Sequence, residues 1–212
     1  MKVCEIFASI QGESSYAGVP CVFVRLSGCN LRCAYCDTTY SYEEGTEMSR
    51  DEVLEKVRAF GLDLVEITGG EPLLQQDETL RLAERLLDSG YRVLMETNGS
   101  FSISGIDPRA VVIMDVKTPS SSMSQANDFS NFDLLKITDE VKFVISDRDD
   151  YEWSRKIVLD HGLGERCVVL FSPAYGRVAV RDLAEWIVGD RLGVRLNLQI
   201  HKYIFGPDER QV

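Results

Sequence analysis

The chain has 212 residues and a formal net charge of −11, with 44% hydrophobic and 27% charged residues. These values are typical of a globular protein with one ordinary domain and a sizeable core. The negative charge disfavours contact with a nucleic-acid backbone, which lysine and arginine normally bind. No run approaches the roughly 20 apolar residues of a membrane span, and the first residues lack a signal-peptide pattern. We therefore expect a cytoplasmic protein without a nucleic-acid or membrane partner.

Strands and helices are predicted to alternate along residues 1–212 as one domain, because no linker or repeat divides them. The predicted strands lie within 5–15 and at Pro20–Leu26, Leu64–Thr68, Tyr91–Glu96, Ala110–Asp115, Glu140–Ile145 and Arg166–Phe171. A capping box predicts a first helix from Ser49 to Gly61. Further helices are predicted at about 78–89, 146–162 and 180–188, and a long loop at 119–133.

The end of the chain alternates between apolar and polar residues, which predicts one more strand over 194–201. Gln199 and His201 would then project together on its polar face. Such a face is usually solvated, but it could also close one side of a site.

The alternation predicts an α/β fold with a parallel sheet, because helical crossovers join parallel strands with right-handed connections. Six core strands with about three covering helices make an incomplete barrel, here with an extra C-terminal strand. Active sites of such sheets lie at the carboxyl ends of the strands. Several polar groups follow these ends: the cysteine loop, Gly69-Gly70, Glu96 to Asn98, Asp115 to Lys117 and Ser172.

Three cysteines stand close together at Cys29, Cys33 and Cys36. Thiolates are the usual ligands of iron–sulfur clusters, and a loop can direct all three at one spot. A four-iron cluster held by three cysteines keeps one iron open, and an open metal position is typical of catalysis. The alternative is a zinc site completed by Cys4, Cys21 or a histidine, although zinc ligands usually come in two close pairs. A disulfide is disfavoured because nothing indicates an oxidising compartment.

Two further features have both a structural and a functional interpretation. Gly69-Gly70 after a strand can form a simple turn or let a ligand approach the backbone closely, and Glu71 adds an acceptor for an ammonium group. Arg25 interrupts an apolar strand. It either reaches solvent at the strand end or pairs with a carboxylate in a pocket.

The cysteine spacing, with Tyr35 before the last cysteine, resembles the signature of the radical S-adenosylmethionine (SAM) enzymes. Gly69-Gly70-Glu71-Pro72 resembles the motif that holds the amino group of SAM in that superfamily. A narrower resemblance, to the 7-carboxy-7-deazaguanine synthase family, spans nearly the whole chain. Its motifs are Phe7 to Glu13, Gly18 to Pro20, Phe23 to Leu26, the cysteine loop with Asp37-Thr38, Glu96 to Gly99, Asp115 to Ser120 and Gln199 to Lys202. Ser14 stands where the family usually has glycine, and Tyr35 where tryptophan is frequent.

The family resemblance implies a ring contraction of 6-carboxy-5,6,7,8-tetrahydropterin to 7-carboxy-7-deazaguanine with loss of ammonia, on the path to queuosine and other 7-deazapurines. A reduced [4Fe–4S] cluster cleaves SAM to a radical that takes hydrogen from C6 of the pterin, and SAM is regenerated. The resemblance also implies Mg2+ as a cofactor, an electron donor such as flavodoxin or ferredoxin, and a homodimer.

The same resemblance implies the site residues. Cys29, Cys33 and Cys36 hold the cluster, and Thr38 binds Mg2+. The pterin-binding residues are Gln11, Gly12, Glu13, Arg25, Gly70 and His201. The SAM-binding residues are Tyr35, Gly69, Gly70, Glu71, Glu96, Lys117, Ser120 and Ser172. No single catalytic residue is assigned, because the radical comes from SAM.

Two alternatives stay open at this point. A glycyl-radical-enzyme activase shares the cysteine loop and a short barrel but acts on a protein substrate. A zinc-stabilised binding module is the alternative without enzyme activity.

Overall fold

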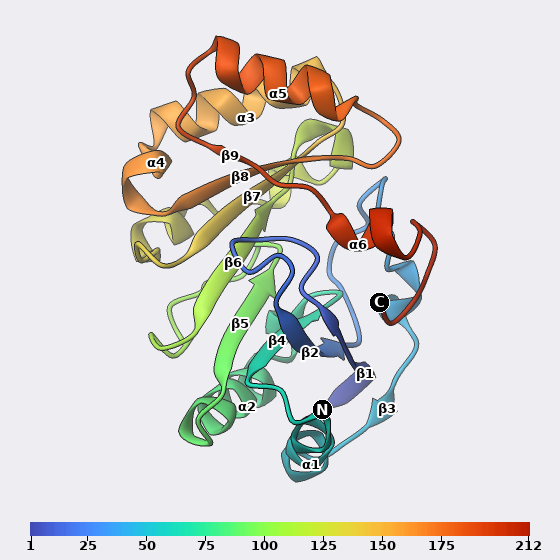
Figure 1. Ribbon diagram of the computed structural model, residues 1–212. Helices are drawn as coiled ribbons and strands as arrows, with labels where there is room; N and C mark the ends of the chain where they lie inside the picture. The colour runs from blue at the N-terminus through green and yellow to red at the C-terminus, as the bar shows by residue number, and fades with distance from the viewer.

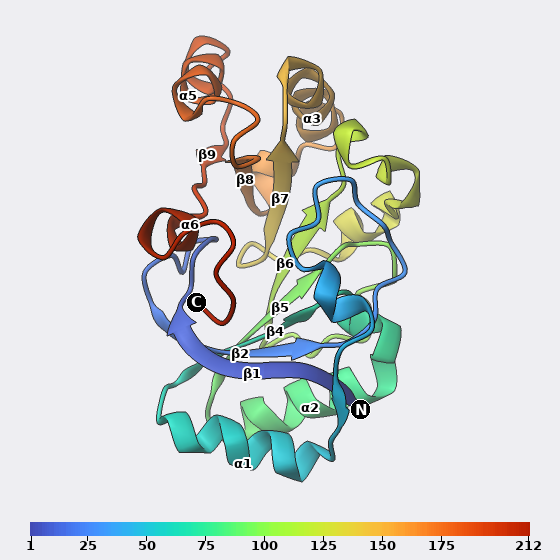
Figure 2. The same cartoon turned by 90° about the vertical axis from the view of Figure 1, so that its right-hand side faces the viewer.

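A curved sheet forms the framework of the protein, with its longer helices outside (Figure 1, Figure 2). The computed structural model describes residues 1–212. The strands are β1 (Lys2–Ile10), β2 (Pro20–Leu26), β3 (Thr46–Glu47), β4 (Leu64–Gly69), β5 (Arg92–Thr97), β6 (Val111–Val116), β7 (Glu140–Ile145), β8 (Val168–Pro173) and β9 (Arg195–Leu196). The α-helices are α1 (Arg50–Phe60), α2 (Gln76–Asp88), α3 (Arg148–Asp160), α4 (Leu163–Arg166), α5 (Val180–Gly189) and α6 (Ile200–Ile204). Short 3-10 helices are η1 (Thr39–Tyr42), η2 (Pro72–Gln75), η3 (Pro119–Ser121), η4 (Ser124–Ala126) and η5 (Phe129–Leu134).

The sheet is mostly parallel, in the order β3-β1-β2-β4-β5-β6-β7-β8-β9. All neighbours from β2 to β9 are parallel, whereas β1 is antiparallel to both β2 and β3. The six predicted core strands are therefore confirmed as β2, β4, β5, β6, β7 and β8. Helices α1, α2 and α3 cross between core strands, and no helix separates β5 from β6, as the sequence predicts.

Alternate residues of each core strand face two different environments, because side chains of a strand point to opposite faces. In β4, Val65 and Ile67 belong to an apolar cluster with residues of α1 and α2. Glu66 and Thr68, one residue further along, line a cavity on the concave face. A second apolar cluster packs β6, β7 and β8 against α3 and α5.

The concave face is not polar throughout. A smaller apolar cluster fills the interior of the barrel and includes Phe7, Phe23, Leu94 and Ile113. The rings of Phe7 and Phe23 are stacked with their centroids 5.0 Å apart. The larger cavity lies on the side of this cluster toward the carboxyl ends of the parallel strands, which is where the active sites of such sheets lie.

The prediction of a strand over 194–201 is wrong for most of that range. Pairing with β8 stops at Leu196, and Asn197 donates its backbone N–H to the Phe171 carbonyl at 2.9 Å. Residues from Ile200 form helix α6 instead, and the Ile200 N–H donates to the Gly12 carbonyl at 2.8 Å. The apolar pair Ile200 and Ile204 fits one face of a helix as well as the period of a strand.

The predicted loop at 119–133 consists of tight turns with a buried anchor. Asn131 is buried and accepts the Ile103 N–H at 3.1 Å, while its own amide donates to the Gly99 carbonyl at 3.1 Å. The segment is thereby fixed to the turn that follows β5. No helix of the protein is long and apolar enough to cross a membrane.

The predicted capping box at the start of α1 is confirmed, and it provides a test of local stability. Glu52 donates its backbone N–H to the Ser49 hydroxyl at 3.3 Å, and the Ser49 N–H donates to the Glu52 carboxylate at 2.7 Å. We expect Ser49→Ala to lower the free energy of unfolding by about 1 kcal/mol, measured by urea denaturation. Ser89→Ala, on the exposed end of α2, is the control and should leave the stability unchanged. Equal stability of both variants would contradict the capping role.

Candidate active site

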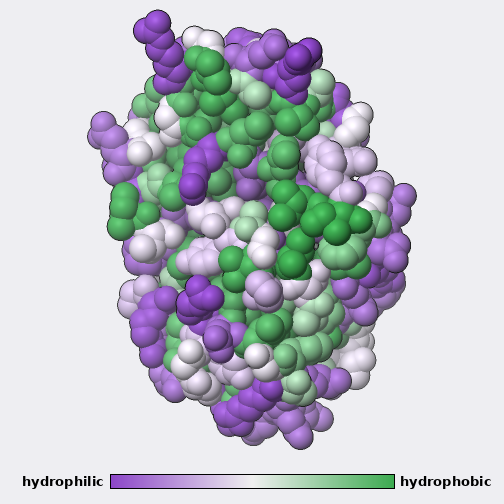
Figure 3. All heavy atoms as spheres, in the orientation of Figure 1, coloured by the Kyte–Doolittle hydropathy of each residue, from purple (hydrophilic) through white to green (hydrophobic).

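A cavity of about 770 Å³ opens at the carboxyl ends of the parallel strands. Its walls come from the concave face of the sheet, the cysteine loop, α6 and residues 207–212 at the end of the chain. Figure 2 shows α6 and the C-terminal residues on the open side of the curved sheet. An exposed apolar patch over α6 lies beside this opening (Figure 3) and includes Tyr203, Ile204 and Phe205.

The cysteine loop brings Cys29, Cys33 and Cys36 to this one cavity. All three thiols are free. No group of three or more histidine, cysteine, aspartate or glutamate side chains is arranged to hold a single metal ion. The Leu31 N–H donates to the Cys29 sulfur at 3.4 Å, the kind of hydrogen bond that stabilises thiolate ligands of iron–sulfur clusters. Burial raises the pKa of the Cys29 and Cys33 thiols, so metal binding there must displace protons.

The glycine pair after β4 is held directly against the cysteine loop. Gly69 and Gly70 line the cavity, and a Cβ atom on Gly70 would lie 2.2 Å from the Gly28 carbonyl oxygen. Any other residue at this position must therefore displace the backbone just before Cys29. Glycine at position 70 is therefore needed for the close packing of the cysteine loop, as well as for the approach of any ligand.

The predicted contact of Glu71 with the SAM amino group stays a prediction, and the structure shows where the carboxylate lies. Glu71 is fully buried and does not line the cavity. Its carboxylate accepts hydrogen bonds from the Leu73 N–H at 2.9 Å, the Thr97 hydroxyl at 2.8 Å and the Asn98 N–H at 2.6 Å. With these three hydrogen bonds, Glu71 ties the glycine turn to the end of β5.

Two of the predicted SAM-binding serines also lie outside the cavity lining. The Ser120 hydroxyl donates to Asp147 at 3.2 Å, at the start of α3. The Ser172 hydroxyl is buried and accepts the Asn197 amide at 2.9 Å. In the structure these hydroxyls join structural elements to each other, and their contact with SAM stays a prediction. Tyr35, Glu96 and Lys117, predicted for the same role, do line the cavity.

The residues predicted for the pterin all line the cavity, and most are already engaged with protein groups. Gln11 donates its amide to Glu66 at 2.5 Å and accepts the Glu13 N–H. One oxygen of the Glu13 carboxylate accepts from Lys142 at 2.8 Å, and the other accepts from the Gln199 amide at 2.7 Å. Gln11 thus positions the loop that carries Glu13.

Arg25 lies on the cavity wall with one edge fixed. Its Nε donates to the Glu5 carboxylate at 2.8 Å, and the Tyr40 hydroxyl donates to the same Glu5 oxygen at 2.9 Å. Nε is the atom of Arg25 that forms the ion pair, which leaves the Nη groups for a ligand. Arg25 thus pairs with the buried Glu5 carboxylate, which does not itself line the cavity.

Helix α6 brings His201 against the loop after β1. A Cβ atom on Gly12 would lie 2.0 Å from the His201 Nδ1 atom, so glycine is required for this contact. Burial lowers the pKa of His201. Next to it, Lys202 donates to Asp37 at 2.5 Å, which ties α6 to the residue after the last cysteine.

The structure explains how serine fits at position 14, where the family usually has glycine. Its φ is 62°, in the left-handed region that glycine adopts most easily. The Ser14 hydroxyl accepts the Tyr16 N–H at 3.1 Å, a local hydrogen bond of the kind that supports serine in turns. Serine therefore replaces glycine here with its own compensating contact.

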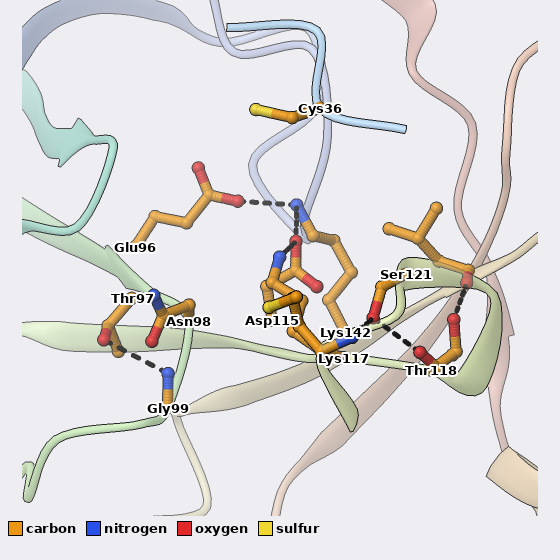
Figure 4. A network of polar contacts seen from close by, with 12 residues as sticks. Cys36, Glu96, Thr97, Asn98, Gly99, Asp115, Lys117, Thr118, Ser121 and Lys142 are labelled. Carbon is orange, nitrogen blue, oxygen red and sulfur yellow. Dashed lines mark hydrogen bonds and ion pairs between the residues drawn. The ribbon is translucent and has the colours of Figure 1, made fainter. Parts of the chain in front are cut away.

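A cluster of charges occupies the floor of the cavity (Figure 4). The Lys142 ammonium lies 2.5 Å from Glu96, 2.8 Å from Glu13 and 3.5 Å from Asp115. Lys117 pairs with Asp115 at 3.1 Å. One oxygen of Asp115 is buried without a hydrogen-bond partner, so this floor has acceptor capacity left for a ligand.

Sequence reasoning missed Lys142 and Glu66 as cavity residues. Each is a charge in the middle of an apolar strand, in the runs Glu140–Ile145 and Leu64–Thr68. Arg25 shows the same pattern and was noticed for it. A charge within a buried strand, one residue away from outward-facing apolar neighbours, is the signal that would have found all three.

The environment of Glu66 predicts a pH dependence of stability. Burial and the neighbouring Glu96 carboxylate raise the pKa of Glu66 to about 8. Burial also disfavours the charge on Glu96, but the Lys142 ammonium outweighs it and lowers the pKa of Glu96 to about 2. At neutral pH, Glu66 is therefore protonated while Glu96 is ionised.

We expect the free energy of unfolding to fall as the pH rises, because of the raised pKa of Glu66. Above the ordinary glutamate pKa of 4.5, the unfolded chain loses a proton that the folded protein keeps until about pH 8. The free energy of unfolding thus decreases by up to about 1.4 kcal/mol per pH unit in this window. Glu66→Gln abolishes this loss, so its advantage over the parent should grow from pH 5 to pH 8 in urea denaturation. The exposed Glu84→Gln variant is the control, and a pH-independent difference for Glu66→Gln would refute the assignment.

Comparison with known proteins agrees with this geometry. A family model described as the radical SAM superfamily matches residues 23–113, which include the cysteine loop, the glycine pair and β5. The structure superposes on QueE from Escherichia coli with a TM-score of 0.78, at 22% identity over 93% of this chain and 92% of that chain. This likeness confirms the predicted fold.

Sequence relatives extend over the whole chain. The 7-carboxy-7-deazaguanine synthase of Koribacter versatilis is 46% identical over 226 aligned residues, which cover 100% of both proteins. The protein of the same name from Chlorobaculum tepidum is 46% identical over 100% of this chain and 97% of its own. The chain therefore belongs to the 7-carboxy-7-deazaguanine synthase family of the radical SAM superfamily.

Proposed function

We propose that this chain catalyses the reaction of its family, the ring contraction of 6-carboxy-5,6,7,8-tetrahydropterin to 7-carboxy-7-deazaguanine with loss of ammonia, in queuosine biosynthesis. The observation that carries the proposal is the full-length identity of 46% to proteins of that name. The cavity supports it, because three free thiols and a polar floor face the same space.

The residues present fit a [4Fe–4S] cluster and SAM. Three cysteines on one cavity wall suit a cluster with one open iron, and the Leu31 N–H already points at a sulfur. When bound, the cluster and SAM supply radical chemistry for hydrogen abstraction from the pterin. Lys117 and Asp115 line the cavity as an ion pair, and one Asp115 oxygen has no hydrogen-bond partner, so we assign them as partners of the charged and polar parts of SAM.

The pterin is assigned to the part of the cavity wall formed by Glu13, Arg25 and His201. Glu13 is an acceptor-only carboxylate that suits the amino and ring N–H donors of a pterin. The Nη groups of Arg25 suit the substrate carboxylate, because a guanidinium offers a planar fork. His201 completes this wall from α6, and burial keeps its ring neutral at neutral pH, since its pKa is lowered.

Mg2+ is assigned to Thr38, which follows the last cysteine by two residues and lines the cavity. The Thr38 hydroxyl lies 3.7 Å from the Cys36 sulfur. Mg2+ prefers oxygen ligands and retains several waters, so one hydroxyl together with a substrate carboxylate is a suitable set.

The remaining assignments follow the family. We assign an electron donor such as flavodoxin or ferredoxin, a homodimeric state and a cytoplasmic location. Gel filtration with light scattering tests the dimer, and reduction of the cluster by each purified donor tests the electron partner.

The cluster assignment predicts which cysteines are needed. Anaerobically purified protein should contain about four irons per chain, and Cys29→Ala, Cys33→Ala and Cys36→Ala should each lose the cluster absorbance. Cys21→Ala and Cys167→Ala are the controls, because both residues are buried outside the cavity lining, and they should retain it. One zinc per chain, or a cluster that survives loss of all three loop cysteines, would refute the assignment and favour a zinc module.

The substrate assignment predicts that binding residues can be separated from the cluster. Glu13→Ala leaves pterin donors without an acceptor, a cost of about 1–3 kcal/mol, and Arg25→Lys removes the planar fork. Both variants should lose formation of the deazaguanine acid, measured by chromatography, while they keep the cluster absorbance and slow SAM cleavage. The parent, assayed anaerobically with SAM, reductant, Mg2+ and the carboxypterin, is the reference.

The outcome also separates the two enzyme classes. A parent protein that leaves the carboxypterin unchanged but installs a radical on a protein substrate would favour a glycyl-radical-enzyme activase. Full product formation by both variants would remove Glu13 and Arg25 from the pterin site.

A further inference from the structure

Lys142 is the most connected charge in the cavity, and the family motifs assign it no role. Its side chain is only 5% exposed. The three carboxylates around it come from different parts of the chain: Glu13 from the loop after β1, Glu96 from β5 and Asp115 from β6. Two of the three N–H donors of its ammonium group bind Glu13 and Glu96, and Asp115 lies 3.5 Å away as an ion-pair partner.

The position of Lys142 between two ligand-binding carboxylates is the important point. In the proposed site Glu13 binds the pterin and Glu96 binds SAM, and both carboxylates accept hydrogen bonds from the same nitrogen, at 2.8 Å and 2.5 Å. Without this cation, the carboxylates would face one another across a buried space and repel each other. No other cation in the structure contacts Glu13 or Glu96.

The second oxygen of Glu13 is held in a different way. It accepts from the neutral Gln199 amide at 2.7 Å, and Gln199 stands directly before α6 at the open side of the cavity. A neutral partner at the opening is easily exchanged for the N–H donors of a ligand. The charged partner below, Lys142, stays in place when that exchange happens.

We propose that Lys142 is a positioning residue for both ligands: it holds Glu13 toward the pterin and Glu96 toward SAM as one shared counter-ion. This inference rests on the proposed function. Lys142 acts through the carboxylates and does not itself contact the reacting atoms. Its effect should therefore appear in ligand affinity, and it should depend on the presence of Glu13.

The test uses Lys142→Met in the cluster-loaded full chain, because methionine has similar length without charge or donors. Calorimetric titration with the carboxypterin in the presence of SAM, with the cluster left oxidised so that no turnover occurs, should show affinity reduced by about tenfold or more. SAM affinity should fall as well, while the cluster absorbance stays at the level of the parent. Lys156→Met, which breaks an exposed pair with Asp160, is the matched control and should bind both ligands normally.

A double-mutant cycle separates positioning from general damage. In the Glu13→Gln background the carboxylate that Lys142 holds toward the pterin is already neutral, so adding Lys142→Met should cost much less pterin affinity than it does in the parent. Equal costs in both backgrounds, or normal affinity of Lys142→Met for both ligands, would overturn the proposal. If the methionine variant does not load the cluster, Lys142→Gln takes its place with the same expected loss, and normal affinity of that variant would overturn the proposal equally.

The outcome is distinct from failure of the proposed function. A parent protein that neither binds nor converts the carboxypterin contradicts the function itself. An active parent together with an unaffected Lys142→Met contradicts only the role of Lys142.

Discussion

The buried charges on the concave face of the sheet must be neutralised by one another, and the site depends on this constraint. An isolated charge in a protein interior is strongly unfavourable, and removal of one partner from a buried pair leaves the other uncompensated. Lys142 meets three carboxylates, Lys117 shares one of them, and Glu66 stays protonated with a pKa of about 8. The charge pattern fixes the directions of Glu13 and Glu96 before any ligand is present, so the protein holds a preorganised polar floor.

The sheet can carry these charges on one face because the side chains of a strand alternate between its two faces. Outward-facing side chains of β2, β4 and β5 join those of α1 and α2 in one apolar cluster, which supplies stability independently of the cavity. The stacked rings of Phe7 and Phe23 close the interior below. The charged side chains of Glu66, Glu96 and Lys142 therefore face the cavity above these rings, and the cysteine loop lines the same cavity. Close packing of Gly70 on the Gly28 carbonyl then sets the distance between that loop and the sheet.

Local patterns in the sequence predicted most of the fold and part of the site. The capping box of α1 and the six parallel strands depend on neighbouring residues and hydrophobic period, so they could be recognised. The hydrogen-bond partners of Glu71 and Ser172 could not be predicted, because a carboxylate or hydroxyl after a strand looks the same whether it faces a ligand or a donor far away in the sequence. Helix α6 was missed for a related reason: the Gly12 carbonyl that receives the Ile200 N–H is far away in the sequence.

The site is formed by residues from both ends of the chain, which affects when it forms during folding. Glu13 contacts Lys142 and Gln199, 129 and 186 residues further along, and Asp37 contacts Lys202 across 165 residues. Contacts of such long range carry the largest loop-closure cost and are made late relative to local structure. No part of the sheet taken alone contains the carboxylates, the ammonium that holds them and the helix that covers them. The geometry of the cavity is thus a property of the completed sheet. The buried charges can neutralise one another only after β1, β7 and α6 have come together.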